Sequence, residues 1–429
     1  MDEKQEPIDL KPLRSVRYWG ASTSAHQVEG KNHNQWSIWE LEHANELAKK
    51  APERLGHWLP EWSAIEAEAT QPDNYVSSVA VDFYNRYESD FDLLQSLNLN
   101  AFRFSIEWSR VEPEPAKWDY TEIDHYRKMI RSLRQRGIEP VVCLFHWSMP
   151  VWFFEMGGFE NRKNVQYFTR FVGRVITELK DELGLVITIN EPNVDVGETY
   201  IQGLRPGPKS LSKGLKVYRN LMRAHKESYM VIKHLKQSIQ VGISQHITHM
   251  KGVNKNPITT MVVQVRSWVW NWLFFNRTKP YHDFIGLNYY TTDHMKLWNK
   301  VNPNNRQNDM GWDMHPYDVR YVIRDGFRRY RKPVMITENG LADRADKYRQ
   351  WWLYETIRGI SDAIAKDSVP VLGYLHWSLL DNFEWTSGFW PRFGLIEVDR
   401  ATLQRRVRKS AAWFGQVLAR LHNQQGKST

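Results

Sequence analysis

Two short stretches, Ile187-Thr188-Ile189-Asn190-Glu191-Pro192 and Met335-Ile336-Thr337-Glu338-Asn339-Gly340, share one pattern. In each, an apolar run rich in β-branched residues ends in a glutamate, and a residue that breaks regular structure follows closely. A short apolar run of this kind predicts a buried strand, so each stretch predicts a strand with a glutamate at its carboxyl end. Two glutamates in matching positions predict a pair of acids facing one substrate bond.

The rest of the chain repeats this alternation of strands and helices. Apolar runs predict eight strands, over residues 18–24, 101–106, 140–145, 185–189, 239–244, 284–287, 334–337 and 369–375. Apolar residues at helical spacing predict helices over residues 82–97, 123–136, 165–183, 215–235, 319–330, 351–365 and 407–421. Strands that alternate with helices favour a parallel sheet. Eight such units favour a closed (β/α)₈ TIM barrel of the α/β class over an open doubly wound sheet.

All eight predicted strands run into polar or aromatic residues, and the carboxyl ends of the strands are where such a barrel places its active site. Length alone does not decide the number of domains, because α/β barrels often exceed the average domain size. We therefore expect residues 1–429 to form one catalytic domain, with flexible termini at residues 1–16 and 423–429.

The overall composition excludes several classes of partner. The formal net charge is +9, but lysine and arginine are interleaved with acids, which is typical of solvated helix faces and argues against nucleic-acid binding. No stretch approaches 18 apolar residues, so we expect no membrane span. Tryptophan is unusually frequent, with 20 residues, and its flat apolar face suits sugar rings although most copies will pack in the core.

The single cysteine, Cys143, excludes an intramolecular disulfide. It lies in an apolar run, so we expect a buried, unreactive thiol. Residues 1–14 are polar and show no signal-peptide pattern. These features predict a cytoplasmic protein.

Cofactor chemistry has little support in the sequence. The first strand lacks a Gly-x-Gly-x-x-Gly turn and no Gly-x-x-x-x-Gly-Lys loop occurs, which argues against dinucleotide and P-loop sites. Four histidines lie near strand ends: His26, His146, His246 and His376. A metal site at the barrel mouth is therefore one interpretation. Neighbouring tryptophan and glutamine residues favour hydrogen-bonding histidines instead, and we expect no metal and no cofactor.

Several long motifs occur in an order that resembles glycoside hydrolase family 1, the retaining β-glucosidase and β-galactosidase family. The resemblance covers residues 18–414. Besides the two glutamate stretches, the motifs are Gly20-Ala21-Ser22-Thr23-Ser24-Ala25-His26-Gln27-Val28-Glu29-Gly30, Phe102-Arg103-Phe104-Ser105-Ile106, His146-Trp147, Asn288-Tyr289-Tyr290 and Trp377-Ser378-Leu379-Leu380-Asp381-Asn382-Phe383-Glu384-Trp385.

The resemblance implies that Glu191 is the acid/base and Glu338 the nucleophile. Retaining glycosidases place two carboxyl groups about 5 to 5.5 Å apart, so that one protonates the leaving oxygen while the other attacks the anomeric carbon. We expect Arg103 and Tyr290 to keep Glu338 ionised. Partial burial and the charge of Glu338 should keep Glu191 protonated.

The resemblance also implies a clamp around the sugar. Its members would be Gln27, His146, Trp147, Asn190, Asn288, Trp377, Glu384 and Trp385. Relatives that act on 6-phosphosugars carry serine at the Glu384 position, so an acid there predicts an unphosphorylated sugar by charge repulsion. The expected partner is a small β-glucoside, with galactoside and fucoside open, hydrolysed by an O-glycosyl hydrolase of the β-glucosidase type.

Each of these residues also has a plainer interpretation. Glu191 could begin a helix, and Trp377 and Trp385 could be core aromatics. Arg103 could pair with Glu107. Asp381 is better explained as a turn residue than as a catalyst. A transglycosylase would retain the same residues. A non-catalytic sugar-binding barrel would be expected to lose one glutamate.

The main departure from the family lies between the fifth and sixth strands. Residues 248–283 are shorter than usual, and an aromatic segment, Trp268-Val269-Trp270-Asn271-Trp272-Leu273-Phe274-Phe275, stands there. We expect this change to open the barrel mouth or to expose apolar aromatics. A homo-oligomer formed through residues 268–275 is the corresponding hypothesis.

Overall fold

The computed structural model describes residues 8–254, 256–303 and 306–425. Eight parallel strands close into a ring: β1 (Tyr18–Ser22), β2 (Ala101–Ser105), β3 (Glu139–Cys143), β4 (Leu185–Asn190), β5 (Gln240–Gly252), β6 (Ile285–Lys296), β8 (Val334–Asn339) and β9 (Val371–Trp377). Neighbours in the ring follow chain order, and β9 pairs with β1 to close it. The predicted (β/α)₈ barrel and its eight strands are confirmed.

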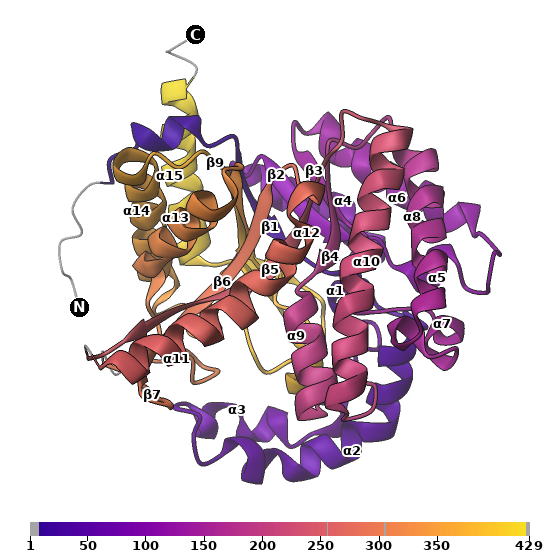
Figure 1. Cartoon of the computed structure of the whole chain (residues 1–429), viewed down its shortest axis with the longest axis horizontal. Coiled ribbons are helices and arrows are strands. Elements are labelled where there is room, and N and C mark those ends of the chain that lie inside the picture. The colour runs from indigo at the N-terminus through magenta and orange to yellow at the C-terminus, as the bar shows by residue number, and fades with distance from the viewer. Residues whose placement is uncertain (1–7, 255, 304–305, 426–429) are drawn as a thin grey trace.

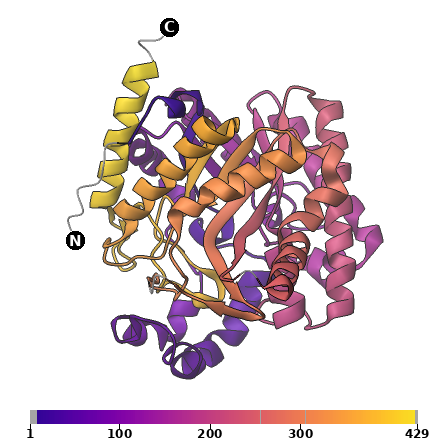
Figure 2. The same cartoon turned by 60° about the vertical axis from the view of Figure 1, so that its left-hand side comes forward.

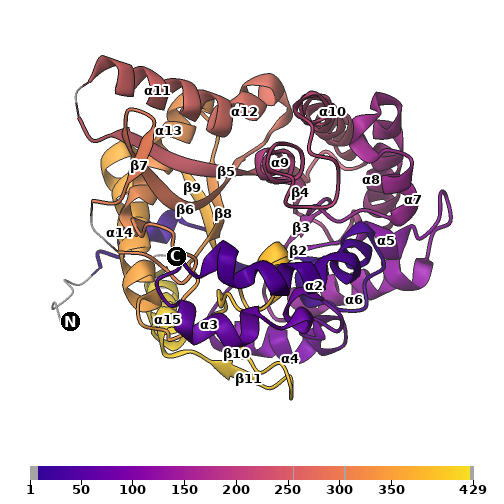
Figure 3. The same ribbon diagram turned by 90° about the horizontal axis from the view of Figure 1, so that it is seen from below.

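The seven predicted helices are also present and surround the strands (Figures 1 and 3). They are α4 (Phe83–Ser96), α6 (Tyr120–Gln135), α8 (Val165–Leu179), α10 (Leu211–Leu235), α13 (Val319–Tyr330), α14 (Arg349–Asp367) and α15 (Lys409–Gln425). Helix α8 shows why they form, because Phe168, Val172 and Leu179 are buried on one face at helical spacing.

Four longer helical segments were not predicted: α2 (Gln35–Leu55), α3 (Trp62–Ala69), α11 (Pro257–Ser267) and α12 (Leu273–Thr278). The core-facing side of α2 includes the small residues Ala44, Ala48 and Ala51, which give a weak apolar signal. Seen from below, α2 and α3 lie on one side of the barrel opening and α11 and α12 on the opposite side (Figure 3).

Short helical elements complete the connections. They are α1 (Ala25–Val28), α5 (Trp108–Val111), α7 (Val151–Glu155), α9 (Pro192–Val196), the π-helices η5 (Gly197–Gln202) and η6 (Trp268–Trp272), and the 3₁₀ turns η1 (Pro12–Ser15), η2 (Pro72–Tyr75), η3 (Gly158–Glu160), η4 (Arg162–Asn164), η7 (Lys279–Tyr281), η8 (Pro316–Asp318) and η9 (Trp385–Ser387). Many of them follow the carboxyl ends of strands, where loops carry functional side chains.

Strands β5 and β6 continue well beyond the predicted residues 239–244 and 284–287. Their extensions remain paired out to Gly252 and Met295, and the antiparallel strand β7 (Asn299–Val301) returns along β6. The sequence gives a weak strand signal here because polar residues interrupt the apolar run. Figure 1 shows α11 beside this extension, and a separate hairpin is formed by β10 (Ile396–Val398) and β11 (Arg405–Val407).

The closed end of the barrel is packed rather than hollow. Its apolar cluster contains Tyr18, Ala101, Val141, Cys143, Leu185, Ile187, Phe284, Met335 and Leu375. Cys143 is fully buried, as predicted, and burial raises the pKa of its thiol, so it is a poor nucleophile. A packed interior leaves the carboxyl ends of the strands as the place for a site.

The predicted flexible termini fall partly outside the described residues, at 1–7 and 426–429. Within the described residues, Leu13 and Val16 are buried in the main core, and α15 continues to Gln425. Helix α15 lies along the edge of the molecule beside the first described residues (Figure 2). Those parts of 1–16 and 423–429 are therefore packed rather than free. No helix among the described residues is long and apolar enough to cross a membrane.

Candidate active site

The two glutamates lie at the carboxyl ends of β4 and β8 and face one cavity. Glu191 directly follows β4 and precedes α9, while Glu338 is the penultimate residue of β8. Both line a cavity of about 280 Å³, which we call the sugar pocket. The predicted pairing of the two acids at one barrel mouth is confirmed, while the carboxyl spacing of about 5 to 5.5 Å stays a prediction.

Glu338 is held by two donors. Arg103 of β2 forms an ion pair with one carboxylate oxygen, and the Tyr290 hydroxyl donates to the other at 2.8 Å. The alternative pairing of Arg103 with Glu107 is excluded, because Glu107 accepts hydrogen bonds from Ser109 and Ser148 instead. Charge-assisted bonds of this kind are the strong ones, so the surroundings of Glu338 suit an anion.

Glu191 has a different environment. One protein donor meets its carboxyl group, the Asn288 amide at 2.8 Å. Burial, followed by the nearby charge of Glu338, raises the pKa of Glu191 well above its usual range. The two carboxyl groups are therefore suited to unequal roles, since the surroundings of Glu191 favour its protonated form while Glu338 is held by a cation.

Asn190 connects the two glutamates through a buried network. Its carbonyl oxygen accepts from Arg103 at 2.6 Å and from Asn288 at 3.2 Å, which fixes the orientation of the amide. Its amide nitrogen then donates to Nε2 of His146 at 3.0 Å. Burial lowers the pKa of His146 well below its usual range, so the ring is neutral and its proton lies on Nδ1. That atom is buried and has no protein partner among the described residues.

The inner end of the sugar pocket is formed by Gln27 and Glu384. The Gln27 amide donates to Glu384 at 3.3 Å, and Ser24 donates to the Gln27 carbonyl oxygen at 2.6 Å. Burial, with a further contribution from the charge of Glu338, raises the pKa of Glu384 to about 8. Glu384 is therefore mostly neutral at pH 7, so the charge repulsion expected toward a phosphate is weaker than the sequence suggested.

Nine of the twelve predicted residues line the sugar pocket: Gln27, His146, Trp147, Glu191, Tyr290, Glu338, Trp377, Glu384 and Trp385. The other three, Arg103, Asn190 and Asn288, are fully buried and act from beneath by hydrogen bonding. Trp377 and Trp385 belong to buried aromatic clusters, as their plainer interpretation expected, and they also line the sugar pocket. The predicted set is brought together by the fold.

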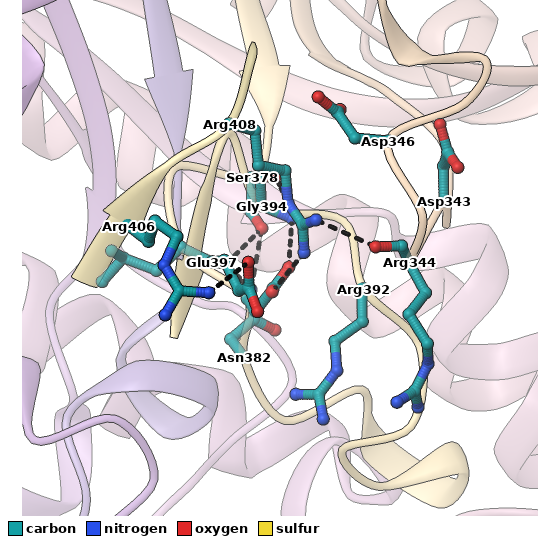
Figure 4. Close-up of polar contacts among 12 residues, drawn as sticks. Asp343, Arg344, Asp346, Ser378, Asn382, Arg392, Gly394, Glu397, Arg406 and Arg408 are labelled. Atoms are coloured by element: carbon teal, nitrogen blue, oxygen red, sulfur yellow. Dashed lines mark hydrogen bonds and ion pairs between the residues drawn. The ribbon is translucent and has the colours of Figure 1, made fainter. Parts of the chain in front are cut away.

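The loop that carries Trp377, Glu384 and Trp385 is anchored by Asp381 and Arg408. Asp381 accepts from Arg408 at 2.7 Å and from the Gly394 backbone at 2.8 Å. Arg408 also donates to the carbonyl oxygens of Gly394 and Arg344, as Figure 4 shows. Asp381 lies in an irregular segment as a buried partner of Arg408 rather than in a turn, and it supports the clamp without lining the sugar pocket.

Backbone strain is concentrated in the site. Trp147, Glu191 and Trp385 all have positive φ values, of 72°, 42° and 50°. Left-handed backbone at a non-glycine residue costs on the order of 1 to 3 kcal/mol and persists where the surroundings enforce it. Next to Glu338 and Asn339, Gly340 is required sterically, because a Cβ there would lie 2.0 Å from the Trp377 carbonyl oxygen.

Further residues line the sugar pocket without having been predicted: Val194, Glu198, Gln202, Arg205, His246, Trp270, Met310, Trp312 and Phe393. Arg205 lies 3.7 Å from the centroid of the Trp147 ring and pairs with Glu198. Most of these residues come from the long connections between strands, where no periodicity or strand end marks them. Only Trp270, in the aromatic segment, and His246, near a predicted strand end, carried a sequence signal.

The histidines near strand ends have hydrogen-bonding partners. His26 contacts Glu40 at 2.6 Å, His246 accepts from Trp270 at 3.1 Å, and His376 contacts Tyr374 at 3.1 Å. Within residues 8–254, 256–303 and 306–425, no group of three His, Cys, Asp or Glu side chains is arranged to hold a metal ion.

The aromatic segment 268–275 is divided between the interior and the surface. Trp272, Phe274 and Phe275 are buried inside the chain, whereas Trp268 and Val269 are almost half exposed. The expectation of exposed apolar residues is confirmed for these two. The three buried aromatics are not available to a second subunit, so the hypothesis of a contact through the whole segment is too broad.

Comparison with known proteins was made for sequence and for structure. The profile of Glycosyl hydrolase family 1 matches residues 11–279 and 274–423. Beta-glucosidase A of Acetivibrio thermocellus is 27% identical over 458 aligned residues, covering 93% of this chain and 96% of that protein. The β-glycosidase from Pyrococcus horikoshii superposes with a TM-score of 0.81 at 31% identity, covering 95% of this chain and 96% of that one.

Another relative has a different activity in its name. The chloroplastic galactolipid galactosyltransferase SFR2 of Arabidopsis thaliana is 28% identical over 361 aligned residues. The alignment covers 78% of this chain and 57% of that protein.

Proposed function

Because the chain belongs to glycosyl hydrolase family 1, we propose that it removes terminal β-D-glucosyl residues from unphosphorylated β-glycosides by double displacement, with retention of configuration. Membership makes it an O-glycosyl hydrolase of the β-glucosidase type. β-D-galactosides and β-D-fucosides are further candidate substrates. The observation that carries the proposal is the unequal environment of the two glutamates.

In the first step, Glu338 attacks the anomeric carbon while Glu191 gives its proton to the leaving oxygen. The C–O bond to the aglycone breaks, and a glucosyl ester of Glu338 forms. Arg103 and Tyr290 orient the attacking carboxylate. Asn190 lies beneath the sugar pocket and holds the ring of His146, which lines the pocket where the sugar hydroxyls would lie.

In the second step, Glu191 acts as a base. Once Glu338 is an ester its negative charge is gone, so one of the two causes of the raised pKa of Glu191 disappears. Glu191, left ionised after the first step, then takes a proton from water, which attacks the anomeric carbon and restores the Glu338 carboxylate.

Preference for an unphosphorylated sugar is part of the proposal. The inner end of the sugar pocket offers Glu384 and Gln27, and the nearby cation Arg205 is already paired with Glu198 and stacked on Trp147. A dianionic phosphate would therefore meet a carboxyl group and no free cation in this part of the described structure. Repulsion should grow above pH 8, where Glu384 ionises.

The test is a panel of nitrophenyl β-glycosides of glucose, galactose, fucose, mannose and 6-phosphoglucose, with the anomer of the first product read by NMR. The β-anomer of glucose should form first. Glu338→Gln should lower turnover by about 10⁴-fold or more, because the nucleophile is removed. Near wild-type turnover of this variant would refute the assignment of Glu338, and activity on the phosphosugar alone would refute the preference.

Two other functions are separated by the same measurements. Absence of any hydrolysis would favour a non-catalytic sugar-binding barrel. Transglycosylation is the second candidate because one relative is named a galactosyltransferase. Product analysis with excess acceptor sugar would distinguish it, since a transglycosylase forms a new glycoside at the expense of free glucose.

We also propose a small carbohydrate as the partner, with no nucleic acid and no membrane, and a cytoplasmic location. The buried thiol of Cys143 suits a reducing compartment. A homo-oligomer, if formed through the aromatic segment, would rest on Trp268 and Val269, and light scattering would test it.

A further inference from the structure

A second cavity lies beside the sugar pocket. Its volume is about 580 Å³, and we call it the side groove. It shares four lining residues with the sugar pocket: His246, Trp270, Tyr290 and Trp312. The two cavities are therefore adjacent.

The side groove joins the sugar pocket at the leaving-group end. Tyr290, which both cavities share, hydrogen-bonds the nucleophile Glu338. Gln27, Glu384 and Trp385, which would hold the sugar, line the sugar pocket only. A glycoside seated with its anomeric carbon at Glu338 would thus send its aglycone toward the side groove.

The walls of the side groove are mainly apolar. Met250 of β5, Val265 of α11 and Val269 of η6 face the shared aromatics Trp270 and Trp312. Burial of a hydrocarbon group against such an apolar surface is favourable. The free energy gained is roughly proportional to the apolar area removed from water.

Three polar side chains along the side groove are engaged with protein partners, whereas the exposed Arg266 makes a long contact to the Met295 sulfur at 3.8 Å. Lys300 pairs with Asp293 at 2.8 Å. The Thr291 hydroxyl donates to the Asp313 carbonyl at 3.2 Å, and His246 accepts from Trp270. A second sugar ring needs several hydrogen-bonding partners, which these engaged groups supply poorly.

The apolar wall continues onto the surface along α11. Ile258, Met261, Val265 and Trp268 recur at spacings of three and four residues, and each is between 45% and 57% exposed. A helix normally turns such a stripe toward the core. Of these four residues only Val265 lines the side groove, and the other three lie on the surface outside it.

We propose that the preferred aglycone is a hydrocarbon chain or a flat hydrocarbon group that lies in the side groove, so that the substrate is an amphiphilic β-glucoside. This inference rests on the proposed function and adds the class of its leaving group. The shortened connection between β5 and β6 creates the groove, because α11 forms one wall where a longer segment would stand.

The test compares kcat/KM for methyl, butyl and octyl β-D-glucoside and for cellobiose, all below micellar concentrations. We expect kcat/KM to rise about tenfold or more from methyl to octyl, since a fully buried CH₂ would contribute about fourfold and the groove is open on one side. Octyl glucoside should also exceed cellobiose. A flat dependence on chain length, with hydrolysis intact, would overturn this inference alone, whereas no hydrolysis of any substrate would overturn the proposed function.

Two variants on α11 form a matched pair. Val265 and Met261 are each 57% exposed and lie about one turn apart, but Val265 lines the side groove and Met261 does not. In Val265→Asp the octyl-to-methyl ratio of kcat/KM should fall toward 1, and in Met261→Asp it should stay at the wild-type value. An equal loss of the octyl-to-methyl ratio in both variants would refute binding of the aglycone in the side groove. It would favour adsorption of the alkyl chain on the surface or a second subunit that covers this face.

Discussion

The sugar pocket and the side groove share a border of four residues but are built in different ways. In the sugar pocket, side chains near the ends of β1, β2, β4, β6, β8 and β9 are tied together by hydrogen bonds, and Arg103, Asn190 and Asn288 are fully buried. The side groove owes part of its wall to α11 and η6, which lie between β5 and β6 and are partly exposed. The difference indicates that strand ends fix the chemistry, while the shortened connection between β5 and β6 borders the place proposed for the leaving group.

Glu191 lines the sugar pocket but not the side groove, and its replacement should give the largest effect. Glu191→Gln should lower kcat/KM by about 10³-fold or more for alkyl glucosides, which need a proton on the leaving oxygen. The loss should be much smaller for 2,4-dinitrophenyl β-glucoside, whose leaving group needs no acid. The comparison of both substrates under identical conditions checks this. An equal loss on both would show that Glu191 does not act as the acid.

Replacement of Asn288 tests the sugar pocket, and its expected effect on kcat/KM is smaller than that of replacing Glu191. The Asn288 amide holds Glu191 and Asn190, so Asn288→Ala should lower kcat/KM by roughly 10- to 100-fold, the range for losing a hydrogen bond to an ionisable group.

The same substitution should move the pH profile in a defined direction. The Asn288 bond favours the ionised form of Glu191 and lowers its pKa, so its removal raises that pKa further. The rate falls as pH rises through the pKa of the acid, so the basic limb should shift to higher pH. A shift to lower pH would contradict the network, and the substitution in a Glu191→Gln background should shift nothing.

The sequence predicts the sugar pocket well because its residues occupy regular positions. Each strand end is marked by an apolar run that stops at a polar residue, as at Glu191 and Glu338, and a barrel brings such ends together. The network could not be predicted. Whether Arg103 pairs with Glu338 or Glu107 depends on side-chain packing, which no spacing encodes.

The side groove was predicted only as an opening of unknown shape. The pattern of α11 resembles a buried helix, and the extensions of β5 and β6 carry polar residues such as Thr292 and Asp293, so neither gives a usable strand or helix boundary. Arg205 and Trp312 reach the site from irregular loops and leave no periodic signal. Tertiary position, rather than local propensity, decides these features.

The smallest expected effect concerns the inner end of the sugar pocket, far from the groove. Burial and the charge of Glu338 raise the pKa of Glu384 to about 8, so its carboxyl group ionises as pH rises through that value. An ionised carboxylate accepts stronger hydrogen bonds from sugar hydroxyls than a neutral one. The inhibition constant for glucose should therefore fall about three- to tenfold between pH 7 and pH 9, because such bonds differ by about 1 kcal/mol.

In Glu384→Gln the inhibition constant should be independent of pH, while the more exposed control Glu397→Gln should keep the wild-type dependence. A pH dependence that survives in Glu384→Gln would assign it to another group, and octyl-to-methyl selectivity should be unchanged in every case because the side groove does not include Glu384.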